Sequence, residues 1–181
     1  MLHEVIMAGF GGQGIMLIGT LLTYAGKEEG KHVSWLPSYG PEMRGGTANC
    51  AVCVSDEPIA SPVVVEPTSC IVMNGPSFEK FHKATVSDGT LIVNSSLVNV
   101  EDIREDVRVY RIPANGEAKE LGSDRVANMV CLGALLKATG AVSLDTVLKI
   151  LPKVISVRHH SLLPLNEKAL RRGFHLAESL M

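Results

Sequence analysis

The sequence predicts an α/β fold in which a mixed, mostly parallel sheet is flanked by helices and the C-terminal third is helical. A short apolar run at 5–8 leads through six glycine-rich residues, 9–14, into a segment of helical length. Strand, glycine turn and helix in that order are typical of a Rossmann-like unit. From residue 115 onward the apolar residues recur at helical spacing, whereas shorter, strand-sized runs dominate before it.

Length and composition fit one globular domain. The 181 residues are 46% hydrophobic and 20% charged, which is enough to build a core, so we expect a single domain over 1–181. A net charge of −2 and 4% aromatic residues argue against nucleic acid and against an anionic membrane as partners. No apolar run has the length of a membrane helix, and Met1–Glu4 lacks the basic start of a signal peptide, so we expect a cytoplasmic protein.

Most strands are expected in the first two thirds of the chain. The run 5–8 is apolar throughout, which predicts a strand buried on both faces, as in a parallel sheet. A helix is expected from about Gly14 to Gly30, because glycine commonly ends a helix. The next strand is expected at 32–36, ending at Pro37. Further strands are expected at 47–54, 69–73, 91–94 and 107–112, with a short helix at 78–83 opened by Pro76.

The sheet is expected to end near Pro113, where the hydrophobic period changes. Alternating residues along 107–112 predict a half-exposed strand close to an edge of the sheet. Ser123 and Ser143 precede helical periods and are expected to cap them. Helices are expected at 118–121, 125–139, 143–151 and 165–180.

The stretch Gly9-Phe10-Gly11-Gly12-Gln13-Gly14 matches the pattern G-x-G-x-x-G. Glycines let the backbone turn sharply and let an anion approach the exposed N–H groups at a helix start, where the helix dipole also favours negative charge. We therefore predict that the backbone N–H groups of Gly11, Gly12, Gln13 and Gly14 receive phosphate or carboxylate groups. The Gln13 amide is expected to orient the ligand. Many matches to this pattern are tight turns without a ligand, and that alternative stays open.

An ordinary dinucleotide site is disfavoured. Such a site needs an acidic residue about 20 positions after the glycines, at the end of the second strand, to hold the ribose hydroxyls. The residues at that place are Pro37-Ser38-Tyr39-Gly40, and none of them is acidic.

A second glycine-rich, polar stretch covers 38–47 and is predicted to be a loop at the carboxyl end of the second strand, beside the first glycine loop. Arg44 is predicted to supply a charged fork to a ligand phosphate or to an acidic residue of a partner, with Ser38 as a further ligand-binding residue. In the alternative interpretation the stretch is a solvated connection in which Glu42 and Arg44 only pair with each other. The predicted interface residues are Tyr39, Pro41, Glu42 and Met43.

The sequence offers no recognisable catalytic group or metal site. Cys50 and Cys53 have metal-site spacing, but they fall in a predicted strand, where residues three apart point to opposite faces. With Cys70 and Cys131 they are expected to be buried apolar residues that hold no iron–sulfur cluster. No histidine spacing, nucleophile elbow or Walker pattern points to other chemistry. A binding loop without reactive groups indicates a subunit whose partners hold the reactive cofactor.

Several motifs in register resemble one family. The stretch 9–14 resembles the G-x-G-G-Q-G signature of the gamma subunit of 2-oxoacid:ferredoxin oxidoreductases. The stretch 38–46 is similar to that family's second loop, and 54–59 with Ser61-Pro62 is similar to its next strand pattern. Asn128-Met129 in the predicted late helix also fits, so the likeness spans essentially the whole chain.

The resemblance implies a role in an enzyme complex that decarboxylates a 2-oxoacid oxidatively to an acyl-coenzyme A and reduces ferredoxin. It places thiamine diphosphate on alpha and beta subunits and iron–sulfur clusters on a ferredoxin-like delta subunit or domain. The gamma chain would bind no cofactor alone, but would pack against the alpha subunit and help to bind coenzyme A at the interface. The stretch 38–49 most resembles 2-oxoglutarate enzymes, and branched-chain, pyruvate and indolepyruvate members share much of it.

Two functions of other classes stay open. One is a free-standing nucleotide-binding oxidoreductase, which the missing acidic residue disfavours. The other is a purely structural assembly subunit, in which the two loops serve only as an interface. The sequence also leaves open whether the isolated chain forms a homodimer.

Overall fold

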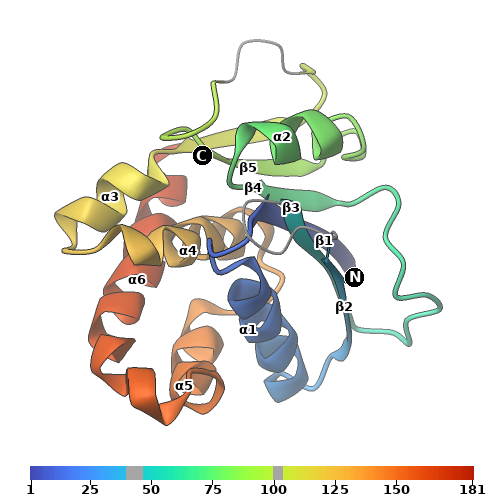
Figure 1. The fold of residues 1–181 in the computed structure, drawn as a ribbon. Helices are drawn as coiled ribbons and strands as arrows, with labels where there is room; N and C mark the ends of the chain where they lie inside the picture. Colours follow the sequence, from blue (N-terminus) through green and yellow to red (C-terminus); the bar gives the residue numbers. More distant parts are fainter. Residues whose placement is uncertain (40–46, 100–103) are drawn as a thin grey trace.

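The computed structural model describes residues 1–39, 47–99 and 104–181. These residues form a six-stranded sheet in the order β2-β3-β1-β4-β5-β6, with helices on both faces (Figure 1). The strands are β1 (Leu2–Phe10), β2 (His32–Tyr39), β3 (Thr47–Ser55), β4 (Ser69–Val72), β5 (Thr90–Asn94) and β6 (Arg108–Ile112).

The sheet is mixed, as the sequence predicts. Strands β1, β4, β5 and β6 run parallel to one another, whereas β3 runs antiparallel to both β1 and β2. The buried run Val5–Gly9 of β1 therefore has a parallel neighbour on one side only. The neighbour on the other side, β3, is antiparallel because only residues 40–46 separate it from β2, and a parallel crossover needs a dozen or more residues. As predicted, β6 forms an edge of the sheet.

The second strand is longer than predicted. It continues through Pro37 and includes Ser38, which the sequence had suggested to be a loop residue. Because β2 is an edge strand, it has no outer neighbour that would need the hydrogen bond that proline lacks.

Both glycine-rich stretches follow strands that end on the same side of the sheet, at the carboxyl ends of β1 and β2. Phe10 at the end of β1 pairs with Thr47, and Ala48 of β3 pairs with Tyr39 at the end of β2. The carboxyl ends of β1 and β2 therefore lie at the same end of the sheet, as predicted. Residues 40–46, including Pro41, Glu42, Met43 and Arg44, lie outside the described residues.

Figure 1 shows α1, α4, α5 and α6 on one face of the sheet and α2 on the other. Ser143 and Ser123 cap helical segments as predicted, since their hydroxyls accept the N–H groups of Thr146 and Arg125. Helix α5 continues past Pro152 to Val154 instead of ending before the proline. The φ of proline is compatible with the helix, and the loss of one hydrogen bond is tolerated in the last turn. The helices are α1 (Ile15–Glu28), α2 (Gly75–Phe81), α3 (Ala114–Glu120), α4 (Ala127–Thr139), α5 (Leu144–Val154) and α6 (Leu163–Ser179), with 3₁₀ turns η1 (Asp124–Val126) and η2 (Val157–Leu162).

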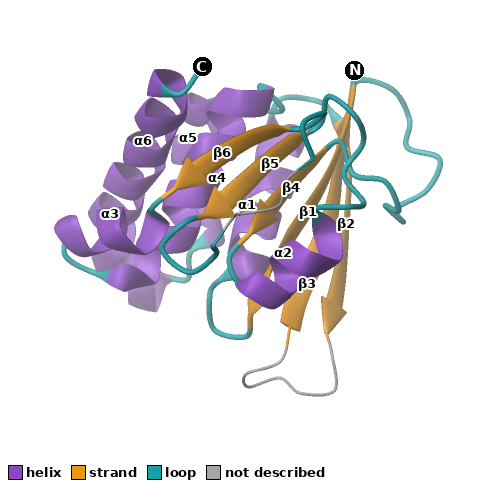
Figure 2. Ribbon diagram, turned by 90° about the horizontal axis from the view of Figure 1, so that it is seen from above, coloured by secondary structure: helices purple, strands orange, loops and turns teal. Residues whose placement is uncertain are grey.

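The larger core lies between the sheet and the helices α1, α4, α5 and α6. A smaller core lies under α2, which Figure 2 shows beside the sheet. It contains Phe78 and Phe81 of α2 together with Val72 and Val93 of the sheet. Nearly every residue of α4 is buried, which explains why its apolar residues do not form a single stripe. Among the residues described, no helix combines the length and the apolar character needed to cross a bilayer.

Helices α4 and α6 approach each other so closely that only glycine fits at two positions. A Cβ atom on Gly133 of α4 would overlap the carbonyl oxygen of Leu170, and one on Gly173 of α6 would overlap that of Val130. The two glycines thus permit backbone contact in both directions across the helix pair. This contact sets the depth of α4 between the sheet and α6.

We predict that Gly133→Ala destabilises the protein by about 1–3 kcal/mol or more, because the new methyl group meets rigid backbone. Gly116→Ala is the matched control, since Gly116 also lies within a helix but its Cβ would meet no atom within 4 Å. The control is expected to be neutral or stabilising by about 0.5–1 kcal/mol. Urea unfolding measures both. Equal effects of the two substitutions would contradict the close contact of α4 and α6.

Candidate functional site

The glycine loop, residues 9–14, joins the end of β1 to the start of α1. Gly14 has φ 73° and ψ 25°, and Gly12 has φ 95°, so both occupy left-handed conformations that favour glycine. Space also restricts the loop. A Cβ on Gly9 would lie 2.6 Å from Gln13 Oε1, and one on Gly14 would overlap the side chain of Asn128. Gly14 is therefore required both by its backbone angles and by its neighbour.

Gln13 closes the loop through its own contacts. Its Oε1 accepts the N–H of Phe10 at 2.6 Å, and its Nε2 lies 3.5 Å from the carbonyl oxygen of Met73, at the end of β4. The backbone N–H of Gln13 donates to the carbonyl of Phe10 at 3.1 Å and is not free for a ligand. Within the described part of the chain, the N–H groups of Gly11, Gly12 and Gly14 have no acceptor.

The N-terminus of α1 carries no compensating negative charge of its own. Gly14 occupies the cap position, no side chain of the described residues caps the helix, and its first turn holds no acidic residue. The N–H groups of that turn, which lack partners within the helix, therefore keep the partial positive charge of the helix dipole. Such a terminus favours an anionic group.

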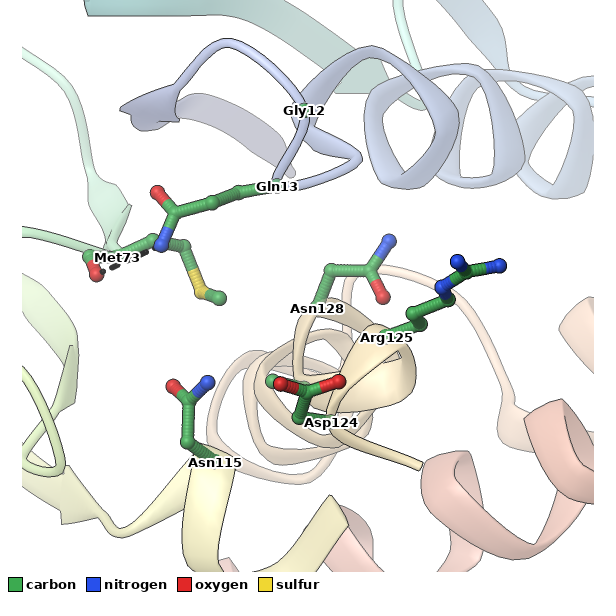
Figure 3. A pocket seen from close by; sticks show the side chains of 8 residues that line it. Gly12, Gln13, Met73, Asn115, Asp124, Arg125 and Asn128 are labelled. Atoms are coloured by element: carbon green, nitrogen blue, oxygen red, sulfur yellow. Dashed lines mark hydrogen bonds between the residues drawn. The ribbon is translucent and has the colours of Figure 1, made fainter. Parts of the chain in front are cut away.

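A polar cavity of about 240 Å³ opens beside the loop. Figure 3 shows amide and charged side chains gathered around it from elements far apart in the sequence. One wall comes from the glycine loop and the end of β4, and the other from α3, η1 and the first turn of α4. The cavity is lined by Gly12, Gln13, Met73, Asn115, Asp124, Arg125, Ala127 and Asn128.

The lining combines complementary groups. The exposed guanidinium of Arg125 and the α1 terminus favour anions, whereas the exposed carboxylate of Asp124 accepts hydrogen bonds from hydroxyl or amide groups. The amides of Asn115 and Asn128 can both donate and accept. The cavity therefore suits an extended ligand that carries an anionic group and neutral polar groups.

The predicted residues are only partly brought together. Of the predicted loop residues, Gly12 and Gln13 line the cavity, whereas Gly11 and Gly14 do not. Ser38 is exposed on β2, with β3 between it and β1, and it does not line the cavity. Tyr39 ends β2, and nothing further is described of its side chain. The proposed roles of Ser38, Arg44 and the interface residues stay predictions.

Sequence reasoning missed the wall from the helical third. Asn115, Asp124 and Arg125 line the cavity, and none of them is among the site residues that the sequence predicts. Asn94, fully buried at the end of β5, donates to Asn115 Oδ1 at 2.8 Å and to the Met73 carbonyl at 3.4 Å. The available signal was a polar residue at the carboxyl end of an otherwise apolar strand.

The cysteines do not fit an iron–sulfur cluster. All four are free and buried, and Cys50 and Cys53 lie three residues apart on β3, so their side chains point to opposite faces. Burial raises the pKa of the Cys50, Cys70 and Cys131 thiols to about 12 and also raises the pKa of Cys53. Cluster ligands are thiolates, and these thiols stay protonated at neutral pH. Among the described residues, no three His, Cys, Asp or Glu side chains gather into a metal site.

Comparison with known proteins gives the family. The model of the pyruvate ferredoxin/flavodoxin oxidoreductases matches residues 4–176. The chain belongs to this family. The predicted resemblance to the gamma subunit of 2-oxoacid:ferredoxin oxidoreductases is thereby confirmed.

Two curated relatives illustrate the range of this family. The chain is 37% identical over 152 residues to the 2-oxoglutarate synthase subunit KorC of Methanocaldococcus jannaschii, covering 82% of this chain and 81% of KorC. It is 40% identical over 142 residues to the ketoisovalerate oxidoreductase subunit VorA of Methanothermobacter marburgensis. That match covers 78% of this chain but 29% of VorA, so the chain spans less than a third of that relative.

Two solved structures share the fold. The gamma subunit of a keto/oxoacid ferredoxin oxidoreductase from Geobacter sulfurreducens is 28% identical with a TM-score of 0.86, covering 99% of this chain and 98% of that one. The 2-oxoglutarate:ferredoxin oxidoreductase from Magnetococcus marinus, described with 2-oxoglutarate, coenzyme A and succinyl-CoA bound, is 27% identical with a TM-score of 0.90. The match covers 99% of this chain and 32% of the Magnetococcus marinus chain. The present chain is thus a gamma-type chain of this family.

We predict that DTNB labels the thiols of the native protein slowly at pH 8, because burial makes them inaccessible and raises the pKa of each of them, so that they stay protonated. In guanidinium chloride the same reagent is expected to label all four cysteines at once. The absorbance of the released thiolate measures both rates. Rapid labelling of any thiol in the native protein would contradict the buried placement.

Proposed function

We propose that the chain is the gamma subunit of a cytoplasmic 2-oxoacid:ferredoxin oxidoreductase, a single domain over 1–181 that acts within a larger complex. The complex would convert a 2-oxoacid, coenzyme A and oxidised ferredoxin to an acyl-coenzyme A, carbon dioxide and reduced ferredoxin. Its partners would be alpha and beta subunits, a ferredoxin-like delta subunit or domain, and ferredoxin itself. Thiamine diphosphate and iron–sulfur clusters on those partners supply the decarboxylation and electron-transfer chemistry.

This chain would contribute a coenzyme A site. The observation that carries the proposal is the terminus of α1, where the N–H groups of Gly11, Gly12 and Gly14 have no acceptor among the described residues and Gly12 lines a polar cavity. Coenzyme A carries phosphate groups for such a terminus, and it has amide and hydroxyl groups for the remaining polar lining. A cavity of about 240 Å³ is smaller than the sites of drug-sized ligands, so a partner subunit would complete the site.

The second loop would complete the site from the same edge of the sheet. Tyr39 and Thr47 flank it there, level with Phe10 of the glycine loop. Arg44 and Ser38 would assist ligand binding, and Tyr39, Pro41, Glu42 and Met43 would contact the alpha subunit. Exposed aromatic, Met and Arg side chains are favoured at such interfaces.

The 2-oxoacid is proposed to be 2-oxoglutarate, because the match to the KorC subunit covers most of both chains. A ketoisovalerate or pyruvate enzyme is the alternative, since VorA carries a similar segment and the family model is named for pyruvate. Sequence similarity across these enzymes is expected if the gamma chain does not line the 2-oxoacid pocket.

A purely structural role is the second candidate function. The exposed edge strand β2 supports it, because an uncharged strand with Trp35 and Leu36 partly exposed can contact a partner. In that case the cavity would hold no ligand. Measuring coenzyme A binding to the alpha–beta–delta assembly with and without this chain separates the two functions.

We predict that Arg125→Ala raises the KM for coenzyme A of the assembled complex about tenfold. A charge-assisted hydrogen bond contributes about 1.5–3 kcal/mol, and about 1.4 kcal/mol changes an equilibrium constant tenfold. The rate at saturating coenzyme A should change little, because the substitution removes binding rather than a reacting group. Steady-state kinetics with ferredoxin as the electron acceptor provide both values.

Arg108→Ala is the matched control. Arg108 is also exposed, but it is the first residue of β6. It therefore lies at the amino ends of the parallel strands, whereas the cavity lies at their carboxyl ends. Its replacement should leave the KM for coenzyme A unchanged. If Arg125→Ala behaves like Arg108→Ala, and omission of the chain leaves coenzyme A binding intact, the structural role is the correct one.

A further inference from the structure

Asn128 joins the first turn of α4 to the glycine loop. Its side chain is 4% exposed, and its Nδ2 donates to the carbonyl oxygen of Gly14 at 3.2 Å. Its Oδ1 accepts the backbone N–H of Met129 at 2.9 Å, which satisfies one of the free donors at the start of α4. Both ends of one buried amide are therefore committed, one to each helix start.

The bond to Gly14 acts on the peptide plane that opens α1. The same carbonyl accepts the N–H of Ile18 at 3.3 Å, so it points along the helix toward its interior. Because the peptide is planar and trans, the N–H of Ile15 points the opposite way, out of the N-terminal end of α1. Fixing the Gly14 carbonyl thus fixes the direction of a donor at the proposed anion site.

Two further amides hold the other side of the loop. Gln13 Nε2 lies 3.5 Å from the Met73 carbonyl, and Asn94 Nδ2 donates to the same oxygen at 3.4 Å. On this side the loop is thereby tied to Met73 after β4, and Asn94 of β5 donates to the same Met73 oxygen. Asn128 ties it to α4 on the other side.

We propose that Asn128 is a positioning residue for the glycine loop, holding the Gly14–Ile15 peptide so that its N–H meets an anionic group of the ligand. This inference rests on the proposed function, because it takes the glycine loop as the place where coenzyme A binds. A donor on the carbonyl side of a peptide also polarises its N–H, which strengthens the bond to the anion. Asn128 acts only through Gly14 and Ile15.

The isosteric variant Asn128→Asp separates positioning from packing. It keeps the volume and the acceptor for the N–H of Met129, so it opens no void, although a buried carboxylate facing the Gly14 carbonyl should lower the thermal midpoint. It replaces the donor to Gly14 with a carboxylate, which repels both the carbonyl and the anion. The KM of the assembled complex for coenzyme A should rise at least tenfold, with kcat at saturating coenzyme A within about twofold.

Asn128→Ala and Asn166→Ala complete the comparison. Asn128→Ala should raise the KM less than Asn128→Asp, because it removes the donor without adding a charge, although it creates a larger void. Asn166 is the matched control, since its Nδ2 donates to the Leu162 carbonyl at 2.8 Å from a buried position on α6. Asn166→Ala should lower the thermal midpoint and leave the KM unchanged.

Gly14→Ala tests the contact without reference to the ligand. Its methyl group would overlap the Asn128 side chain, so the loss in thermal midpoint should be smaller in an Asn128→Ala background than in the wild type. Equal losses in both backgrounds would show that the two residues do not meet, and the inference would be wrong.

The kinetic results distinguish failure of the positioning role of Asn128 from failure of the proposed coenzyme A site. If Arg125→Ala raises the KM but Asn128→Asp leaves it unchanged, the site stands and Asn128 has no positioning role. If Asn128→Ala raises the KM more than Asn128→Asp, Asn128 acts by packing and the inference is wrong. If neither Arg125→Ala nor Asn128→Asp changes the KM, the proposed coenzyme A site itself is wrong.

Discussion

The close contact of α4 with α6 determines where the rest of the helical third can lie. Gly133 and Gly173 let the two backbones meet, and the opposite side of α4 packs against the sheet and α1. Because α4 is buried on nearly all sides, neither its depth nor its rotation can change without disturbing the core. Its first turn is thereby held next to the glycine loop, where Asn128 meets Gly14.

The site is a product of topology as well as of local sequence. Because β1, β4 and β5 are parallel, their carboxyl ends lie on the same side of the sheet. The helical third of the chain, more than a hundred residues further on, returns to that side. The glycine loop supplies main-chain donors, and the returning segment supplies Asp124 and Arg125. Neither half alone has the chemistry of the whole cavity. The four cysteines are all free and buried, so they add no reactive group to the cavity.

Much of the fold could be predicted from sequence, because most signals were local. The run Val5–Ala8, the glycine turn and the helix after it followed one another as expected, and Ser143 capped its helix. The strand β2 was longer than expected because Pro37 lies at an edge, and edge position is a property of the whole sheet. The far wall of the cavity was missed for the same reason. Nothing near Asn94 or Asn115 in the sequence shows that they meet at 2.8 Å.

The burial of α4 has a consequence for how the cavity responds to a ligand. Backbone amides in the middle of such a helix are expected to exchange with solvent only when the whole domain opens, so the first turn of α4 is joined to the most slowly opening part of the protein. Asn128, which is buried in that turn, therefore keeps its place before any ligand arrives. Little conformational entropy is lost on that side during binding, and a weakly interacting ligand can still be held in one orientation.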